Sequence, residues 1–256
     1  MPTFGFGKVN GVDRNPSKHV ILPVNSASIS TTQSKWGGSS LYLPGAYSGA
    51  EVQAGPSPFT GSITVDTSIM SGGDFTIEMW IYPTTLALNT GGSSGNYYPN
   101  FAGDFNQDST SGGFNRGWTF GYNGTTLAFS NGGVGTYTPS SGSAPSLNAW
   151  NHIYVQRNGT TLYFGLNGLN RSSTNYVNWT TYSDAPIRIG HTFDDVHNDS
   201  YTGYINDFRM SNIARYSTTG FYTQPTAQFT PDSNTIVLAH FNGPSGSTSF
   251  EDSAVF

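Results

Sequence analysis

The stretch LNAWNHIYVQRNGTTLYFGLNG, residues 147–168, indicates how the chain folds. A strand-forming run over 152–157 meets Asn158-Gly159, and a second run over 162–166 leads to another Asn-Gly at 167–168. Asn-Gly flanked by such runs is the strongest short-range signal of a β-hairpin. The stretch therefore predicts antiparallel strands joined by tight turns.

A second hairpin is predicted upstream of this stretch. Trp118, Phe120 and Tyr122 alternate with other residues up to Asn123-Gly124, and the alternation resumes over 127–129. Alternation with a period of two is the pattern of a half-buried strand. We expect a type I′ turn at 123–124, because both central residues of that turn need positive φ angles.

More short apolar runs, each bounded by Gly, Asn, Ser or Pro, predict further strands. They cover residues 39–43, 62–65, 75–82, 187–189, 204–210 and 235–241. So many short strands within 256 residues predict an all-β fold. We expect one two-sheet antiparallel β-sandwich or jelly roll.

The composition of the chain agrees with this fold and excludes several classes of protein. Charged residues make up only 10%, while the chain has 32 glycines, 17 phenylalanines and 15 tyrosines. Long exposed helices need Lys and Glu, which are scarce here. The net charge of -5 disfavours nucleic acid as a partner, because phosphate binding requires clustered Lys and Arg. The absence of cysteine excludes disulfides and thiolate metal sites.

Residues 1–18 differ from the rest of the chain and predict an N-terminal arm ahead of one sandwich over 19–256. They show little alternation and contain the FGFG element at 4–7. Such a segment is either a frayed terminus or a segment that orders against a partner. In the second case Phe4 and Phe6 attach the chain to that partner. No signal-peptide core and no run of about 20 apolar residues is present, so we expect no membrane insertion.

Four stretches share their order and spacing with a known family. They are SKWGGSSLYLPG (34–45), DFTIEMWIYP (74–83), the stretch 147–168 and GYINDFRMSNIARYS (203–217). Together they resemble the concanavalin A-like lectin/glucanase superfamily, in the laminin G-like form common in structural proteins of marine bacteriophages. The resemblance extends over nearly all of residues 20–256 and implies a laminin G-like jelly roll.

The stretch DSNTIVLAHFNGPSGSTSFEDS (232–253) resembles the opening strand of that family, but here it comes last. We therefore expect a C-terminal strand over 235–241 in the place of the usual first strand. A sheet that lacks one strand exposes unpaired backbone groups. The strand could fill that place in its own subunit or in a neighbour, and we favour its own.

Oxygen-bearing side chains suggest calcium as a cofactor. Residues 191–200 contain Asp194, Asp195, Asn198 and Asp199, and oxygen ligands of this kind suit calcium. The resemblance adds Asn206, Asp207 and Asp252, although the family usually has Asp where this chain has Asn206. The alternative is that these residues form solvated turns, with Asp207 paired to Arg209 or Arg188.

Aromatic residues in or beside predicted loops are candidates for binding carbohydrate, because flat rings stack on sugars. The candidates are Tyr97, Tyr98, Phe105, Trp179 and Tyr182, with Phe114 nearby. Packing in the core or at a subunit contact is the alternative for each of them. Trp36, Trp80 and Trp150 fall within the strand motifs, and we assign them to the core.

Catalytic residues are not evident, and we expect no enzyme activity. Retaining glycoside hydrolysis needs two carboxylates roughly 5–5.5 Å apart. The acidic triplet of the family's glucanases is missing, and Glu78 stands alone in TIEMW. Among the aspartates only a pair such as Asp104 and Asp108 remains open.

The resemblance implies a non-enzymatic bacteriophage virion protein, made in the host cytoplasm. We expect a capsid or tail decoration protein that contacts other virion proteins and forms a homo-oligomer. The alternative is a glycan-binding receptor-recognition module, such as a tail fibre or adhesin, whose partners are glycans on the host surface.

Overall fold

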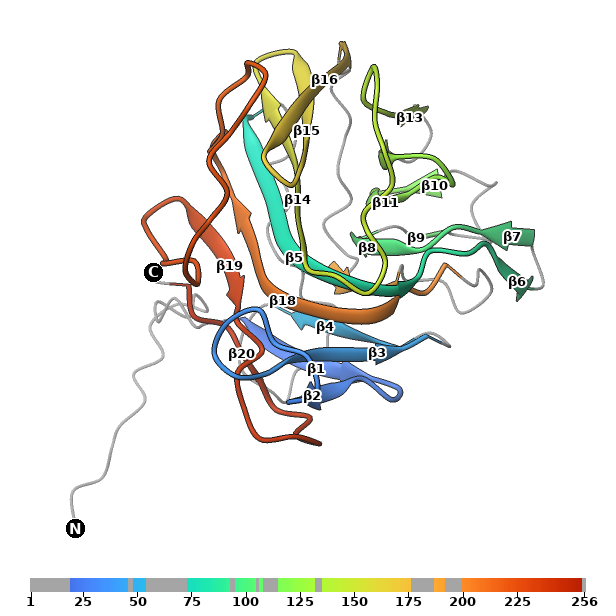
Figure 1. Cartoon of the computed structure of the whole chain (residues 1–256), viewed down its shortest axis with the longest axis vertical. Helices are drawn as coiled ribbons and strands as arrows, with labels where there is room; N and C mark the ends of the chain where they lie inside the picture. The colour runs from blue at the N-terminus through green and yellow to red at the C-terminus, as the bar shows by residue number, and fades with distance from the viewer. Residues whose placement is uncertain are drawn as a thin grey trace, which may run out of the picture.

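The computed structural model describes residues 19–45, 48–53, 73–92, 95–104, 106–107, 115–131, 135–175, 187–191 and 199–254. Within these residues every regular element is a β-strand. Two large antiparallel sheets form a sandwich (Figure 1). The predicted all-β, two-sheet jelly-roll fold is therefore confirmed. None of the described residues forms a helix that is long and apolar enough to cross a membrane.

The first sheet, which we call sheet A, contains eight strands. In spatial order they are β13 (Gly135–Tyr137), β12 (Leu127–Asn131), β11 (Trp118–Tyr122), β8 (Asn100–Gly103), β17 (Ile187–Ile189), β4 (Gly49–Gln53), β1 (Val20–Val24) and β20 (Phe250–Glu251).

The second sheet, sheet B, also contains eight strands. In spatial order they are β16 (Leu169–Asn175), β15 (Thr161–Leu166), β14 (Asn151–Asn158), β5 (Phe75–Thr85), β18 (Thr202–Ser211), β3 (Ser40–Pro44) and β2 (Ser28–Ser30), with β19 (Thr235–Ala239) also paired to β18. Two small ribbons complete the fold, β6 (Asn89–Gly92) with β7 (Gly95–Tyr97), and β9 (Asn106–Gln107) with β10 (Asn115–Arg116).

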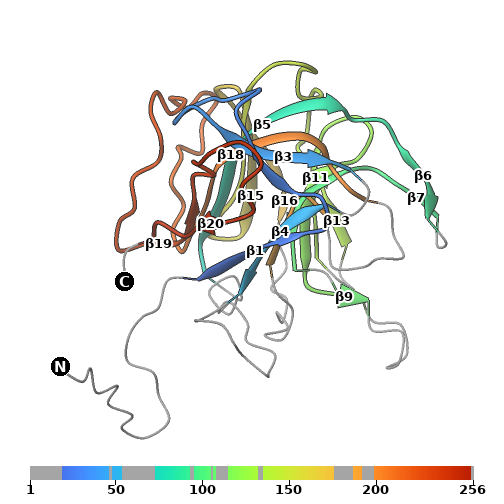
Figure 2. The same ribbon diagram turned by 90° about the horizontal axis from the view of Figure 1, so that it is seen from below.

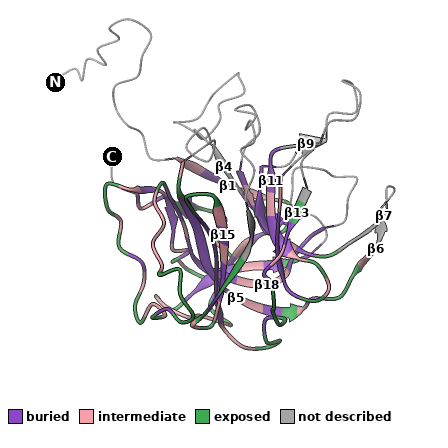
Figure 3. Ribbon diagram, turned by 90° about the horizontal axis from the view of Figure 1, so that it is seen from above, coloured by how far each residue is buried: buried purple, intermediate pink, exposed green. Residues whose placement is uncertain are grey.

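The main core lies between the two sheets and follows the alternation in the sequence. On β5, Ile77, Met79 and Ile81 are buried in this core. From sheet A, Trp118 and Phe120 are buried against the same core. Figure 1 shows the long strands β5 and β18 curving around sheet A, and Figure 2 shows the sandwich from below. In Figure 3 the buried residues concentrate along the strands of both sheets.

The outer face of sheet B is partly covered by a second layer. Residues 212–234, which we call the strap, run across this face and bring Phe229 against Trp80 and Leu238. Trp36 and Trp150 pack at the margin of this second cluster. The outer face of sheet B is therefore buried only locally.

The three Asn-Gly pairs of the predicted hairpins form three different turns. Asn167 and Gly168 have φ angles of 50° and 88°, as a type I′ turn requires. At the predicted Asn158-Gly159 turn, Asn158 pairs with Thr161 at the end of the ladder, and Gly159 takes a positive φ of 61°.

The type I′ turn predicted at Asn123-Gly124 is wrong. Only Gly124 has a positive φ, and the loop spans four residues because Tyr122 pairs with Leu127. The Asn123 side-chain oxygen accepts hydrogen bonds from the amides of Thr125 and Thr126. This side-chain bonding stabilises the longer loop instead of the two-residue turn.

The C-terminal strand lies within its own chain. β19 pairs antiparallel with the second half of β18, from Phe208↔Ala239 to Ser211↔Thr235, while β3 pairs with the first half. The change of partner occurs at Asp207, which has a φ of 60° and interrupts the register with β5. The arm over 1–18, with Phe4 and Phe6, and the predicted strand over 62–65 lie outside the described residues.

Candidate functional site

Aromatic side chains gather where the outer face of sheet B is not covered by the strap. Side chains of a strand alternate between the two faces of a sheet. On β5, Ile77, Met79 and Ile81 point to the core, so Trp80 and Tyr82 point to the outer face. Tyr82 is half-buried, whereas Trp80 is covered by the strap.

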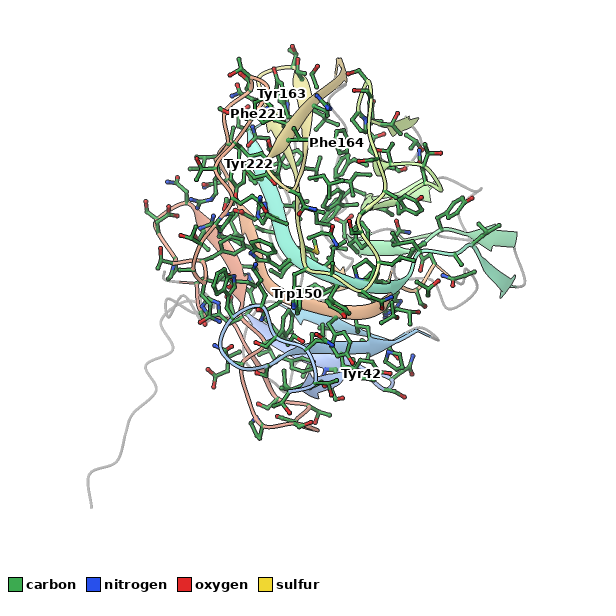
Figure 4. The ribbon with its side chains drawn as sticks, in the orientation of Figure 1. Tyr42, Trp150, Tyr163, Phe164, Phe221 and Tyr222 are labelled. Carbon is green, nitrogen blue, oxygen red and sulfur yellow. The ribbon has the colours of Figure 1, made fainter. Side chains whose placement is uncertain are left out.

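Four half-buried rings form a continuous row on this face, which we call the aromatic row: Tyr42, Tyr204, Tyr82 and Trp150. Tyr204 pairs with Tyr42 on one side and with Tyr82 on the other. The ring centroids are 5.1 Å apart for Tyr42–Tyr204, 5.9 Å for Tyr204–Tyr82 and 5.6 Å for Tyr82–Trp150. Figure 4 labels the two ends of the row, Tyr42 on β3 and Trp150 before β14. Together the rings present an aromatic strip across three strands of sheet B.

A cation lies beside the aromatic row. The Lys35 Nζ is 4.0 Å from the centroid of the Trp80 ring and 5.0 Å from that of Trp36. Burial lowers the pKa of the Lys35 ammonium. The loop that carries Lys35 is positioned by Asn206, whose side-chain oxygen accepts a hydrogen bond from the Trp36 amide at 2.9 Å. The ammonium is therefore held by two indole rings through cation–π contacts.

The strap covers a buried polar cluster on the same face. Glu78 is fully buried, and its Oε1 contacts Arg209 Nη2 at 2.6 Å and accepts a hydrogen bond from Arg209 Nε at 2.8 Å. The Tyr216 hydroxyl donates to Glu78 Oε2. Burial by itself would raise the pKa of Glu78, but the hydrogen bond with His152 and the charge of Arg209 outweigh it and lower that pKa. Glu78 is therefore a buried carboxylate.

His152 completes this cluster in its neutral form. Burial lowers the pKa of His152, and the nearby carboxylate of Glu78 opposes this only in part. The Nδ1 atom of His152 lies 2.8 Å from the Tyr222 hydroxyl. Burial also raises the pKa of the Tyr216 and Tyr222 hydroxyls.

The polar cluster attaches the strap to sheet B. Arg215 in the strap contacts both carboxylate oxygens of Asp232, at 3.0 Å and 2.7 Å, and its amide donates to Thr76 and Gln156 of the sheet. Within the part of the chain that the structure describes, Glu78 contacts Arg209, His152, Tyr216 and Arg215, and none of these is a second carboxylate. The contacts of Glu78 thus hold the strap in place and do not provide the paired acids of a glycosidase.

The predicted calcium ligands are placed apart or lie outside the described residues. Asp194, Asp195 and Asn198 are not among the described residues. Asp199 is buried and accepts a hydrogen bond from Asn100 at 2.9 Å. Within the described residues no group of three or more His, Cys, Asp or Glu side chains gathers as a metal site. Calcium binding remains a prediction.

The ligands that the family resemblance suggested are bonded to the protein. Asp207 Oδ1 is 2.5 Å from His240 Nδ1, and Oδ2 accepts the Phe229 amide at 2.7 Å. The expected pairing of Asp207 with Arg209 or Arg188 is therefore wrong, because the bulge at Asp207 turns its carboxylate toward β19 and the strap.

Asp252 and Asn206 are likewise bonded to the protein. Asp252 accepts the Leu238 amide and contacts His19 Nδ1 at 2.7 Å. Asn206 donates to the carbonyls of Ser39 and His240. The three residues connect sheet strands and loops in this structure.

Only Tyr98 among the predicted carbohydrate-binding side chains is placed by the structure. It is 37% exposed and packs edge-on against Tyr122, away from the row. The backbone of Tyr97 ends β7, whereas Phe105, Phe114, Trp179 and Tyr182 lie outside the described residues.

Three tryptophans were assigned to the core, and only one of them, Trp80, is buried. Trp80 belongs to the second cluster rather than to the main core, and Trp36 and Trp150 are half-buried at its margin. The tyrosines of the aromatic row were missed. Their signal is present in the sequence, because each stands next to an aliphatic residue that points into the core: Leu41 beside Tyr42, Ile81 beside Tyr82 and Ile205 beside Tyr204.

Comparison with known proteins places the chain in a family. The family model described as the concanavalin A-like lectin/glucanases superfamily matches residues 53–219, more than half of the chain but less than the resemblance over 20–256 suggested. No curated protein matches the chain in sequence.

Solved structures share the fold at low sequence identity. Domain 4 of AbnA, an extracellular arabinanase from Geobacillus stearothermophilus solved with arabinotriose, is 15% identical with a TM-score of 0.50, and the match covers 82% of this chain and 86% of that domain. Tailspike protein 2 of an Escherichia coli O157:H7 bacteriophage is 11% identical with a TM-score of 0.48, and the match covers 80% of this chain and 27% of the tailspike. From its fold and the family match, the chain belongs to the concanavalin A-like lectin/glucanase superfamily.

Proposed function

We propose that the chain is a non-enzymatic glycan-binding module and that the aromatic row is its binding surface. The observation that carries this proposal is the line of four half-buried rings across β3, β18 and β5, ending at Trp150. Buried aromatic rings stabilise a core, but rings that remain partly accessible in a line provide faces for a ligand. Sugar rings present C–H groups that pack on such faces.

The geometry of the aromatic row favours a chain of several sugars. Neighbouring rings are separated by 5.1–5.9 Å, and they are tilted or edge-on to one another rather than coplanar. A flat crystalline surface would need coplanar rings, whereas a twisted soluble chain can place successive units on tilted faces. The ligand class is therefore a soluble, linear oligosaccharide or polysaccharide.

The charge near the aromatic row favours a neutral glycan. The tyrosine and tryptophan rings carry no charge, and the adjacent ammonium of Lys35 is already held over Trp36 and Trp80. The arabinanase domain of similar fold was solved with arabinotriose, a neutral linear sugar. This likeness supports the choice of neutral linear polysaccharides as probes.

A panel of soluble polysaccharides tests the proposal. Linear arabinan, xylan and mixed-linkage glucan are cast into native gels, and retardation of the wild-type protein is compared with that of Tyr204→Ala. Tyr163 on β15 provides a matched control, because it is also half-buried in sheet B but lies outside the aromatic row. We expect at least one glycan to retard wild type and Tyr163→Ala but not Tyr204→Ala. Retardation of all three proteins, or of none, would contradict the proposal.

The absence of enzyme activity is part of the same proposal. Glu78 is enclosed by Arg209, His152 and Tyr216 beneath the strap, so this carboxylate is not available to a sugar. Reducing-sugar release from the polysaccharides that bind should stay at the level of a blank. Release that depends on Asp104 would refute this part.

We also propose that the chain is part of a bacteriophage particle. In this proposal the protein is made in the host cytoplasm, forms a homo-oligomer and contacts other virion proteins. The support is the sequence resemblance to phage structural proteins together with the distinct segment 1–18. Mass spectrometry of purified virions should find the chain, with hundreds of copies for capsid decoration and few for a tail adhesin. Deletion of residues 1–18 should abolish particle attachment. Full occupancy after deletion would contradict a role for Phe4 and Phe6.

A further inference from the structure

A groove opens between the two sheets at β12, β15 and β16, and none of its lining residues belongs to the aromatic row. Its apolar floor is formed by Leu127 of β12 in sheet A and by Phe164 and Leu166 of β15 in sheet B. Its volume is about 240 Å³. In Figure 4 Phe164 lies on the side of β15 that faces sheet A, whereas Tyr163 and Phe221 lie on the other side. The groove is thus a gap in the main sandwich, whereas the aromatic row lies on the outer face.

Among the described residues that line the groove, one side chain is ionisable, and it is positive. Arg171 of β16 is exposed, lines the groove and pairs across the ladder with Phe164, so the two side chains lie on the same face of the sheet. Ser141 and Ser143, in the loop before β14, also line the groove. A guanidinium binds a carboxylate through two parallel hydrogen bonds. The charge of the lining is therefore complementary to a carboxylate.

The loop that brings Ser141 and Ser143 to the groove is held by close packing. Gly142 approaches Thr126 so closely that a side chain at position 142 would overlap the threonine hydroxyl. The same loop is joined to β16 by a hydrogen bond from the Ser140 amide to the Ser172 carbonyl at 3.0 Å. At the other end of the loop, Asn151 bonds both the amide and the carbonyl of Ser146. The groove is thus preformed, as small-molecule sites usually are.

The size and chemistry of the groove select one class of ligand. Its 240 Å³ exceed the roughly 150 Å³ of a protein cavity that holds benzene, so one six-membered ring with substituents fits. The apolar floor favours a ligand with an apolar ring face over a bare inorganic anion. The hydroxyls of Ser141 and Ser143 favour a ring that carries hydroxyl groups of its own.

We propose that this groove is a second binding site, for a single acidic sugar of the hexuronate class. The carboxylate of the sugar pairs with Arg171, one face of its ring packs on Phe164 and Leu127, and its hydroxyls bond to Ser141 and Ser143. The site is separate from the aromatic row and does not depend on the row binding a neutral glycan.

A titration followed by NMR tests the second site, with sodium glucuronate as the probe, and glucose and sodium benzoate as comparisons. We expect glucuronate to shift the amide signals of residues 141–143 and 171, and glucose and benzoate to bind at least tenfold more weakly. Arg171→Gln should weaken glucuronate binding at least about tenfold, because the change removes both the positive charge and the two parallel hydrogen bonds that a guanidinium gives to a carboxylate. Arg171→Lys, which keeps the charge without the fork, should fall between these two proteins.

Two control variants make the result decisive. Arg188→Gln, on β17 of sheet A and outside the groove lining, and Tyr204→Ala, in the aromatic row, should both bind glucuronate like wild type. No shifts near residues 141–143 with glucuronate, or equal binding of glucose, would overturn the proposal. Unchanged binding by Arg171→Gln would overturn it as well, and benzoate binding as tight as that of glucuronate would refute the acidic-sugar class.

Discussion

The buried carboxylate of Glu78 provides the sharpest test of how the strap is attached to sheet B. The change Glu78→Gln keeps the size of the side chain and removes its charge. Arg209, whose side chain is only 11% exposed, then loses the partner that it contacts at 2.6 Å and 2.8 Å, and the Tyr216 hydroxyl loses its charged acceptor. The strap is therefore expected to be held less firmly.

The expected loss of stability follows from these contacts. Breaking one side of a buried ion pair costs about 3–5 kcal/mol. Arg209 keeps a position 4.3 Å from the centroid of the Phe229 ring and a long hydrogen bond to the Thr230 carbonyl, so we expect the lower end of this range, about 3 kcal/mol. For a chain of this size that corresponds to a fall in Tm of roughly 6–12 °C.

Urea unfolding followed by tryptophan fluorescence measures this change directly. The control is Glu251→Gln on β20, an exposed position where we expect a change within about 0.5 kcal/mol. If Glu78→Gln lowers the free energy of unfolding by less than about 1 kcal/mol, the view that the buried carboxylate anchors the strap is refuted.

Three further predictions concern pH, packing and metal. The pKa values of Glu78 and His152 are lower in the folded chain than in the unfolded chain, so the unfolded chain binds protons first and acid destabilises the fold. As the pH falls, stability is lost below about pH 6.5 through His152 and below about 4.3 through Glu78. Unfolding curves from pH 8 to 3 should show this loss of stability. The difference in free energy of unfolding between wild type and His152→Gln should become smaller as the pH falls, and a difference that does not change with pH would contradict the prediction. Gly165→Ala should destabilise by about 1–3 kcal/mol in urea unfolding, because the added methyl group would overlap the buried ring of Tyr154, which stacks on Tyr216; a neutral effect would show that the ring moves freely. If calcium binds at Asp194, Asp195, Asn198 and Asp199, the Tm measured in excess calcium should be higher than the Tm measured with a chelator. Equal Tm values would contradict calcium as a cofactor.

Local patterns predicted the strands well, because the alternation of side chains depends only on neighbours in sequence. The strand predicted over 75–82 is observed as β5 over Phe75–Thr85, and the predicted hairpin at 152–166 is observed as β14 and β15. The turn at Asn123 was wrong because a side-chain hydrogen bond competed with the dipeptide preference.

The site was harder to predict, because alternation tells which residues share a face but not what covers that face. Glu78 and Tyr82 both point outward from β5, yet the strap buries Glu78 and leaves Tyr82 half-buried. The course of the strap depends on contacts such as Tyr216 with Glu78, more than 130 positions apart in sequence. For the same reason the hydrogen-bond partners of Asp207, His240 and Phe229, could not be predicted, because they come from distant segments.

A crystal structure of the chain with an oligosaccharide of the best-binding neutral glycan tests the central claim most directly. The aromatic row predicts sugar rings lying on Tyr42, Tyr204 and Tyr82, with the chain continuing toward Trp150. A sugar bound at Tyr98 or elsewhere on the surface, with the aromatic row empty at saturating ligand, would contradict it.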